Sequence, residues 1–172
     1  MRFVTSLSRL LAAAALFACT LQVSAQAPAP TAAPAVPQYG PNVTQDQARR
    51  AIAAAMVDAR RIGVPMAVAI VDTAGQLVAF ERMENTQTAS ISVSQDKAVS
   101  AAMYRRPTKA FQDGLAAGGN GLRILTLRNA NAVEGGIPLV VDGRIIGAIG
   151  VSGGAAEQDG EVARAGLAGL GR

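Results

Sequence analysis

Two pairs of apolar segments, each joined by a short turn that contains glycine, constrain the fold of this chain most strongly. In the segment 137–151, Asp142 and Gly143 separate two apolar runs, which is the strongest short-range signal for a β-hairpin. In the segment 66–83, a turn that ends at Gly75 separates two further runs. Hairpin strands pair antiparallel, so these segments predict an antiparallel sheet. The four predicted strands are residues 66–71, 76–83, 137–141 and 144–151.

Helical patterns surround both hairpins. Apolar residues recur every three or four positions over residues 44–62, Thr44 and Gln47 form a capping box at the start, and Gly63 is a natural end. The predicted order is therefore α-β-β-α-α-β-β-α, an α+β domain with an antiparallel sheet flanked by helices. The other expected elements are helices at residues 88–104 and 157–170, a short helix ending near residue 115, a helix or strand at 122–127, and a further strand at 131–133.

The first residues have the pattern of a secretory signal peptide, predicted at residues 1–25. Arg2 and Arg9 provide the positive start, residues 10–21 form an apolar run, and residues 23–25 are a small-residue cleavage site. The apolar run is too short to span a bilayer comfortably. We therefore expect a periplasmic or secreted protein.

The rest of the chain divides into a linker and one domain. Residues 26–42 hold most of the chain's prolines and are predicted to be a Pro/Ala-rich linker, and residues 43–172 a single domain. A weak lipoprotein pattern around Cys19 gives a lipid anchor as the alternative to simple cleavage. No later apolar stretch has the length of a membrane span, so we expect no transmembrane span after signal removal.

The composition excludes several kinds of chemistry. The sequence has no histidine, no tryptophan and one cysteine, so it cannot form a Ser-His-Asp relay or a histidine-ligated metal site. Without a side chain whose ordinary pKa lies near 7, a binding protein is favoured over an independent nucleophilic enzyme, and no catalytic residue is assigned. The net charge is only +4 and no basic and aromatic stripe occurs, so no nucleic-acid partner is predicted.

Two glycine-rich segments are candidate binding sites. Residues 145–154 end a strand and open a helix, where backbone N–H groups without Cβ bulk can bind an anion or a carboxylate. Close packing of the strand and the helix explains the same glycines without a ligand. A second glycine pair precedes the strand at residues 137–141 and allows close approach of a ligand or a turn with positive φ. The candidate residues are Glu134, Gly135, Gly136, Ser152, Gly153 and Gly154.

Charged and phenolic side chains form two further candidate sites. Lys97 lies among small polar residues and is interpreted either as the partner of a carboxylate or as a solvated lysine. Tyr104 and Arg105 end the same predicted helix, where a tyrosinate can ligate haem iron and an arginine can pair with propionates. Glu81 and Glu84 are interpreted either as ligands of a hard cation such as ferric iron or as surface charges at a hairpin end.

Five longer motifs occur in a fixed order along the chain: VPMAVAIVDTAGQLVAFERM (64–83), ASISVSQDKAVSAA (89–102), RPT (106–108), GGIPL (135–139) and GRIIGAIGVSGGAAEQD (143–159). In this order they resemble the GlcG/HbpS family, also called the haem-degrading or DUF336 domain. The resemblance implies a profilin-like fold and a homo-oligomer. Some members bind haem or are linked to haem breakdown or iron handling, others accompany glycolate-utilisation genes, and a related domain is fused to a cobalamin adenosyltransferase.

The resemblance implies a secreted or periplasmic haem-binding protein that handles haem or iron. Two alternatives remain open: an accessory protein or enzyme of small-carboxylate metabolism that binds an acid at the glycine-rich corner, and a non-catalytic structural oligomer. Some members use a histidine near the haem, which this chain lacks, so a Tyr, Met, Lys or hydroxyl group would have to ligate the iron. Glu81 and Glu84 resemble an iron-binding pattern of secreted members.

Overall fold

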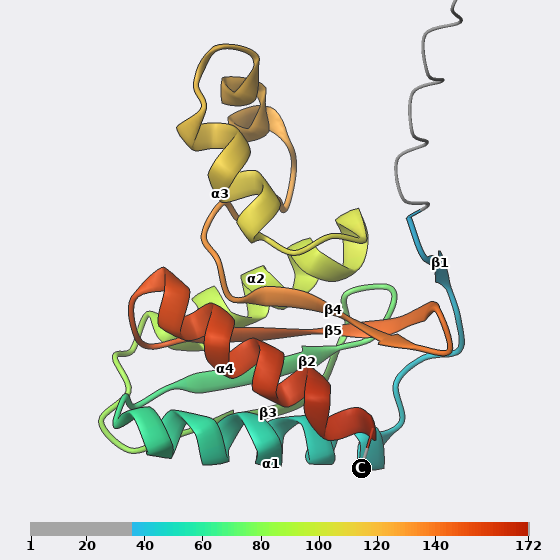
Figure 1. The fold of residues 1–172 in the computed structure, drawn as a ribbon, viewed down its shortest axis with the longest axis vertical. Coiled ribbons are helices and arrows are strands. Elements are labelled where there is room, and N and C mark those ends of the chain that lie inside the picture. Colours follow the sequence, from blue (N-terminus) through green and yellow to red (C-terminus); the bar gives the residue numbers. More distant parts are fainter. Residues whose placement is uncertain (1–35, 172) are drawn as a thin grey trace, which may run out of the picture. The chain divides into compact units, whose positions relative to one another are not determined.

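The computed structural model describes residues 36–171, whose main elements follow the predicted order (Figure 1). The predicted signal peptide and Cys19 lie outside these residues. The helices are α1 (Gln45–Ile62), α2 (Ser90–Tyr104), α3 (Lys109–Ala116) and α4 (Ala156–Ala168). The strands are β1 (Gln38–Tyr39), β2 (Ala67–Val71), β3 (Leu77–Arg82), β4 (Gly136–Val141) and β5 (Arg144–Ser152), and two 3-10 helices are η1 (Gly119–Thr126) and η2 (Gly169–Gly171). The predicted α+β class is confirmed.

The sheet is built around β5, which pairs antiparallel with β2 and with β4. β2 also pairs antiparallel with β3, so both predicted hairpins are confirmed. The short strand β1 lies within the segment predicted as a linker, and it pairs parallel with β5 through Gln38 opposite Arg144 and Tyr39 opposite Ile145. The end of that segment therefore contributes to the sheet.

Helices cover the sheet on both faces, and the residues of β2 are all buried (Figure 1). α1 and α4 pack on each other and on one face, where large aliphatic residues such as Met56, Ile70 and Ile149 form the main core. α2 covers the opposite face, where a second cluster contains mainly alanines, including Ala69, Ala98 and others. Small side chains on that face let α2 approach the strands closely.

The ends of α1 follow local sequence chemistry. The Thr44 hydroxyl accepts from the Gln47 N–H at 3.2 Å, and the Gln47 side chain accepts from the Thr44 N–H at 2.9 Å, so the predicted capping box is present. Gly63 ends the helix with a φ of +71°, a conformation that glycine adopts without a Cβ penalty. The predicted bounds of this helix are therefore confirmed.

The segment between α2 and β4 differs most from the sequence-based expectation. Residues 122–127, interpreted as a helix or a strand, belong to η1, and α3 with η1 stands off from the sheet (Figure 1). We call residues 109–126 the arm. The strand expected at 131–133 is absent from the described chain, because Ser100 accepts the Asn131 N–H and the Asn131 side chain accepts the Val133 N–H. None of the described helices is both long and apolar enough to cross a membrane.

Candidate functional site

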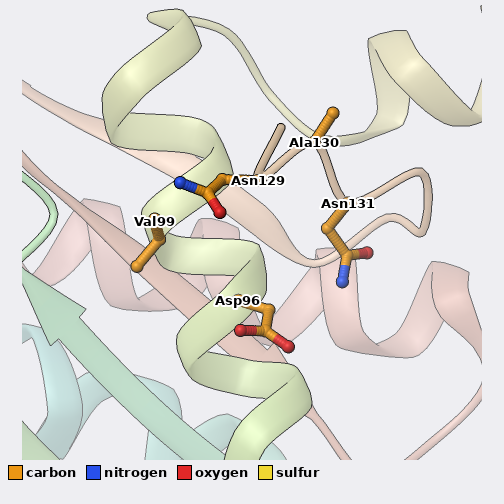
Figure 2. A pocket seen from close by; sticks show the side chains of 5 residues that line it. All are labelled: Asp96, Val99, Asn129, Ala130 and Asn131. Atoms are coloured by element: carbon orange, nitrogen blue, oxygen red, sulfur yellow. The ribbon is translucent and has the colours of Figure 1, made fainter. Parts of the chain in front are cut away.

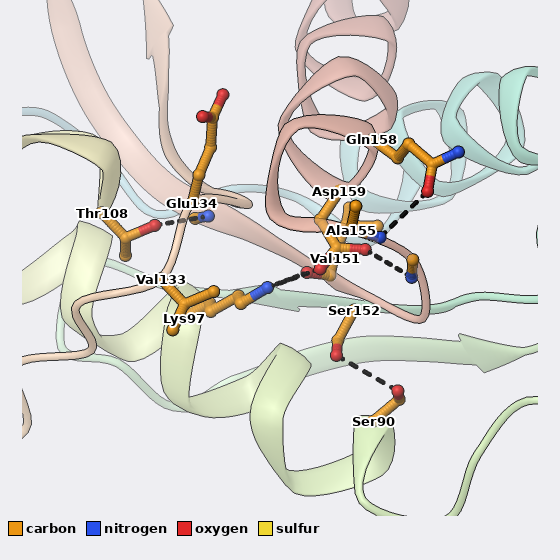
Figure 3. Close-up of polar contacts among 12 residues, drawn as sticks. Ser90, Lys97, Thr108, Val133, Glu134, Val151, Ser152, Ala155, Gln158 and Asp159 are labelled. Carbon is orange, nitrogen blue, oxygen red and sulfur yellow. Dashed lines mark hydrogen bonds and ion pairs between the residues drawn. The ribbon is translucent and has the colours of Figure 1, made fainter. Parts of the chain in front are cut away.

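A buried ion pair joins three elements at the predicted glycine-rich corner (Figure 3). Lys97 Nζ lies 2.7 Å from Asp159 Oδ2 and 3.1 Å from the Val151 carbonyl oxygen. The side chains of Lys97 and Asp159 are 1% and 4% exposed, and Asp159 Oδ1 accepts from the Gly154 N–H at 3.0 Å. The pair thus connects α2, β5 and α4. Lys97 is neither solvated nor directed at an open cavity, because Asp159 is its internal partner.

Two opposing effects act on the Asp159 carboxyl group. Burial raises its pKa above the ordinary value because the charged form loses its hydration. Hydrogen bonds from Lys97 and from the Gly154 and Gly153 N–H groups, together with the Lys97 charge, act in the opposite direction. Removing Lys97 takes away a hydrogen bond and a charge that lower the pKa of Asp159. The pKa therefore rises further, and the carboxyl group becomes harder to ionise.

The glycine pair before β4 is packed against the same ion pair. Gly135 has a φ of +127°, and a Cβ there would lie 2.6 Å from the Val151 carbonyl oxygen and 3.0 Å from Lys97 Nζ. The Gly136 N–H donates to the Thr108 hydroxyl at 2.9 Å, and the Thr108 N–H donates to the Gly136 carbonyl at 2.9 Å. These glycines allow the chain segments to approach each other closely.

The corner after β5 is filled in the same way. A Cβ on Gly153 would lie 2.8 Å from Met66 Cα, and one on Gly154 would lie 2.7 Å from Gln158 Oε1. The Ser152 hydroxyl donates a hydrogen bond to the hydroxyl of Ser90, a buried residue of α2, at 3.1 Å (Figure 3). A Cβ added at Gly135, Gly136, Gly153 or Gly154 would lie within 3 Å of other atoms of the chain, as the close-packing interpretation of these glycines predicts.

Glu134 holds α4 against the loop that precedes β4. Its Oε1 accepts from Arg164 Nη1 at 2.9 Å, while the Glu134 N–H donates to the Gln112 side chain at 2.8 Å. The Glu134 side chain is only 7% exposed, whereas that of Arg164 is 58% exposed. This predicted binding residue is therefore engaged in contacts within the chain.

Tyr104 and Arg105 lie together at the end of α2 but make different contacts. The Tyr104 hydroxyl donates to the Arg128 carbonyl at 2.7 Å, and its ring stands edge-on to Phe111 with the centroids 5.1 Å apart. Arg105 has a φ of +52°, and its guanidinium lies 5.5 Å from the centroid of the Tyr39 ring. Tyr104 thus borders the arm, while Arg105 contacts the segment that contains β1.

The arm encloses a groove with a volume of about 310 Å³ between α3 and η1. Its lining includes the apolar residues Phe111, Ile124 and Leu127 and two arginines, Arg106 and Arg123. The Arg106 guanidinium carbon is 5.7 Å from the Phe111 ring centroid. Sequence patterns did not predict this groove, because residues 122–127 suited a helix and a strand equally and because Arg106 and Arg123 are far apart along the chain.

Glu81 and Glu84 border one open hollow at the end of β3. Arg60 and Arg82 line the same hollow, so positive charge offsets the two carboxylates. Among residues 36–171 there is no group of three or more His, Cys, Asp or Glu side chains arranged to hold a metal ion. Two carboxylates alone are a sparse ligand set for a hard cation.

Comparison with known proteins adds to this geometry. A family model described as "Haem degrading protein HbpS-like" matches residues 43–168. Protein GlcG of Escherichia coli strain K12 is 37% identical over 110 residues, which cover 64% of this chain and 81% of that protein. The structure of a PduOC:heme complex matches with a TM-score of 0.67 at 28% identity, covering 74% of this chain and 94% of that one. That of Streptomyces reticuli HbpS, with two glutamates three positions apart replaced by aspartates, matches with a TM-score of 0.71 at 28% identity, covering 85% and 99%.

Proposed function

The chain belongs to the HbpS-like family of haem-degrading proteins, and from that premise we propose that it binds haem in the groove of the arm. The observation that carries the proposal is that apolar residues and two arginines line one groove. Haem has a flat apolar macrocycle and two propionates, which require those two kinds of surface. The haem complex of a related structure supports the choice of ligand.

The chain's own residues fit the periphery of haem. Phe111, Ile124 and Leu127 would contact the macrocycle, and Arg106 and Arg123 would pair with the propionates. Bound haem would supply a redox-active iron. The sequence contains no histidine. The Tyr104 ring packs edge-on against Phe111, which lines the groove, so its phenol is a candidate iron ligand. To ligate the iron, the Tyr104 hydroxyl would have to give up its hydrogen bond to the Arg128 carbonyl oxygen.

Replacing both arginines of the groove by alanine (Arg106→Ala with Arg123→Ala) is expected to weaken hemin binding at least about tenfold, because both propionates lose a charge-assisted partner. Hemin titration of the purified protein, followed at the Soret band, measures the dissociation constant. Arg49→Ala is the matched control, since Arg49 is an exposed arginine of α1 outside the groove. Unchanged affinity in the double variant would rule out this groove as the site.

Two outcomes would favour the alternative functions instead. A thermal shift with small 2-hydroxy acids in the absence of any response to hemin would support a role in small-carboxylate metabolism. The absence of both responses would support a structural oligomer.

Exposed leucines on the arm support self-association in any of these cases, since Leu122 is 53% and Leu125 is 71% exposed. We therefore propose a homo-oligomer, which sedimentation of the purified protein tests directly.

We also propose iron binding at the hollow beside Glu81 and Glu84, which is supported by the position of both carboxylates on one open hollow. Changing both to glutamine keeps their shape and removes their charge, so ferric iron bound per chain is expected to fall by about one ion. Glu157→Gln, an exposed carboxylate of α4, is the control. Equal iron content in all three proteins would refute the assignment.

The proposed location is the periplasm or the exterior of the cell. It is supported by the signal-peptide pattern of residues 1–25, with lipid attachment at Cys19 as the alternative. The mass of the protein recovered from cells distinguishes cleavage after residue 25, lipid attachment at Cys19 and an unprocessed chain.

A further inference from the structure

A second hollow lies apart from the groove of the arm, between α2 and the loop that follows η1 (Figure 2). Its volume is about 250 Å³. Figure 2 shows that Asp96 and Val99 come from α2, while Asn129 and Asn131 come from the loop. Ala130 completes the lining. We call this space the Asp96 hollow.

Several bonds hold the loop in place above α2. The Asn131 N–H donates to the hydroxyl of Ser100, a fully buried residue of α2, at 3.0 Å. The Tyr104 hydroxyl donates to the Arg128 carbonyl at 2.7 Å. Asn129 adopts a φ of +61°, and its Nδ2 approaches Met103 Sδ at 3.7 Å. The loop is therefore anchored to α2 on both sides of the hollow, which gives the hollow a defined shape.

The hydrogen-bonding groups of the hollow can be assigned one by one. Asn131 Oδ1 accepts from the Val133 N–H at 3.1 Å, so Asn131 Nδ2 remains as a donor. Because Asn129 directs Nδ2 at the Met103 sulfur, its Oδ1 remains as an acceptor. The Asp96 carboxylate has no hydrogen bond or ion pair with any side chain of residues 36–171, and it supplies acceptors only. The hollow thus offers several acceptors, the remaining amide N–H groups of Asn131 and Asn129 as donors, and the apolar surface of Val99.

We propose that the Asp96 hollow binds a small neutral polyol. Each hydroxyl group donates and accepts, so adjacent hydroxyls satisfy Asp96, Asn129 Oδ1 and Asn131 Nδ2 together, and the carbon skeleton lies against Val99. A carboxylate ligand carries only acceptors and would face the charge of Asp96. A simple ammonium ligand carries only donors and offers no acceptor to the half-buried Asn131 amide N–H groups. The hollow is separate from the haem groove, so this inference does not depend on the proposed function.

The test is a titration followed by amide chemical shifts in two-dimensional NMR spectra, with erythritol and glucose as probes and with ethylammonium and acetate, which carry no hydroxyl group, as the charged comparisons. We expect saturable shifts at residues 96 and 129–131 with a polyol at millimolar concentrations, and weaker binding of both charged compounds. Asp96→Asn turns one acceptor into a donor, and Asn131→Asp keeps the bond to Val133 while turning the donor into an acceptor. Each is expected to weaken polyol binding about tenfold or more.

Glu157→Gln serves as the control because it removes an exposed carboxylate on α4 without touching the hollow. It should bind the polyol like the unmodified protein, and all variants should keep their hemin affinity. The proposal is overturned if neither polyol produces saturable shifts, if ethylammonium or acetate binds more tightly than both polyols, or if Asp96→Asn and Asn131→Asp bind the polyols unchanged.

Discussion

Replacing Lys97 by methionine is expected to lower the free energy of unfolding by about 3–5 kcal/mol, the usual range for removing one partner of a buried ion pair. Methionine has nearly the length of lysine, so the change removes the charge with little loss of packing. The Asp159 carboxylate is then left in a buried position where only backbone N–H groups, those of Gly154 and Gly153, still stabilise its charge. Urea denaturation followed by circular dichroism measures the effect.

Two further variants separate the charge of this pair from its packing. Asp159→Asn leaves the Lys97 ammonium without a charged partner and is expected to destabilise the protein by a similar amount. The double variant with Lys97→Met and Asp159→Leu removes both buried charges, and it is expected to be more stable than either single variant. A double variant whose loss equals the sum of the single losses would show that the two side chains act independently.

The deficit of the Lys97→Met variant should also depend on pH. Burial raises the pKa of Asp159 above its ordinary value of 3.8, and removal of Lys97 raises it further because a favourable charge is lost. At pH values between the pKa of Asp159 in the unfolded protein and its raised pKa in the folded protein, the folded state binds more protons than the unfolded state. The contribution of Asp159 to stability therefore falls as the pH rises through this range. The difference in unfolding free energy between the two proteins is therefore expected to be smaller near about pH 4 than at about pH 7.

Local sequence chemistry predicted the fold well because its signals act over a few residues. The capping box at Thr44, the αL end at Gly63 and the turn at Asp142 and Gly143 each depend on neighbouring positions, and each is present. The 3-10 helix of the arm was not resolved from the sequence, since a short apolar run of residues 122–127 suits a helix and a strand equally.

The candidate sites were harder to predict because they depend on contacts between distant segments. Lys97 and Asp159 are 62 positions apart, and in the sequence Asp159 is explained by the dipole of the last helix alone, like the other acids at its start. Arg106 and Arg123 meet in one groove only because α3 turns back into η1. The pattern of apolar and small residues along a helix or strand identifies its buried face. The pattern does not identify which charged side chain of another element packs against that face.

Gly150→Ala is the second substitution with a large expected effect. Gly150 lies in β5 opposite Ala69, and a Cβ there would lie 2.5 Å from the Ala98 N and would also overlap the Ser94 carbonyl oxygen. Both obstructing atoms belong to the backbone of α2, so no side-chain rotation relieves the overlap and the helix has to move away from the sheet. We expect a loss of about 3 kcal/mol or more, at or beyond the upper end of overpacking effects.

Two comparisons test whether this loss comes from the approach of α2 to β5. Gly143→Ala adds the same methyl group in open space at a φ of +72°, so backbone strain alone should cost about 1–2 kcal/mol. Adding Ala98→Gly to Gly150→Ala removes a neighbouring methyl group but not the helix backbone, so stability should not recover. Equal stability of Gly150→Ala and Gly143→Ala, or full recovery with Ala98→Gly, would mean that α2 does not lie against β5 through its backbone.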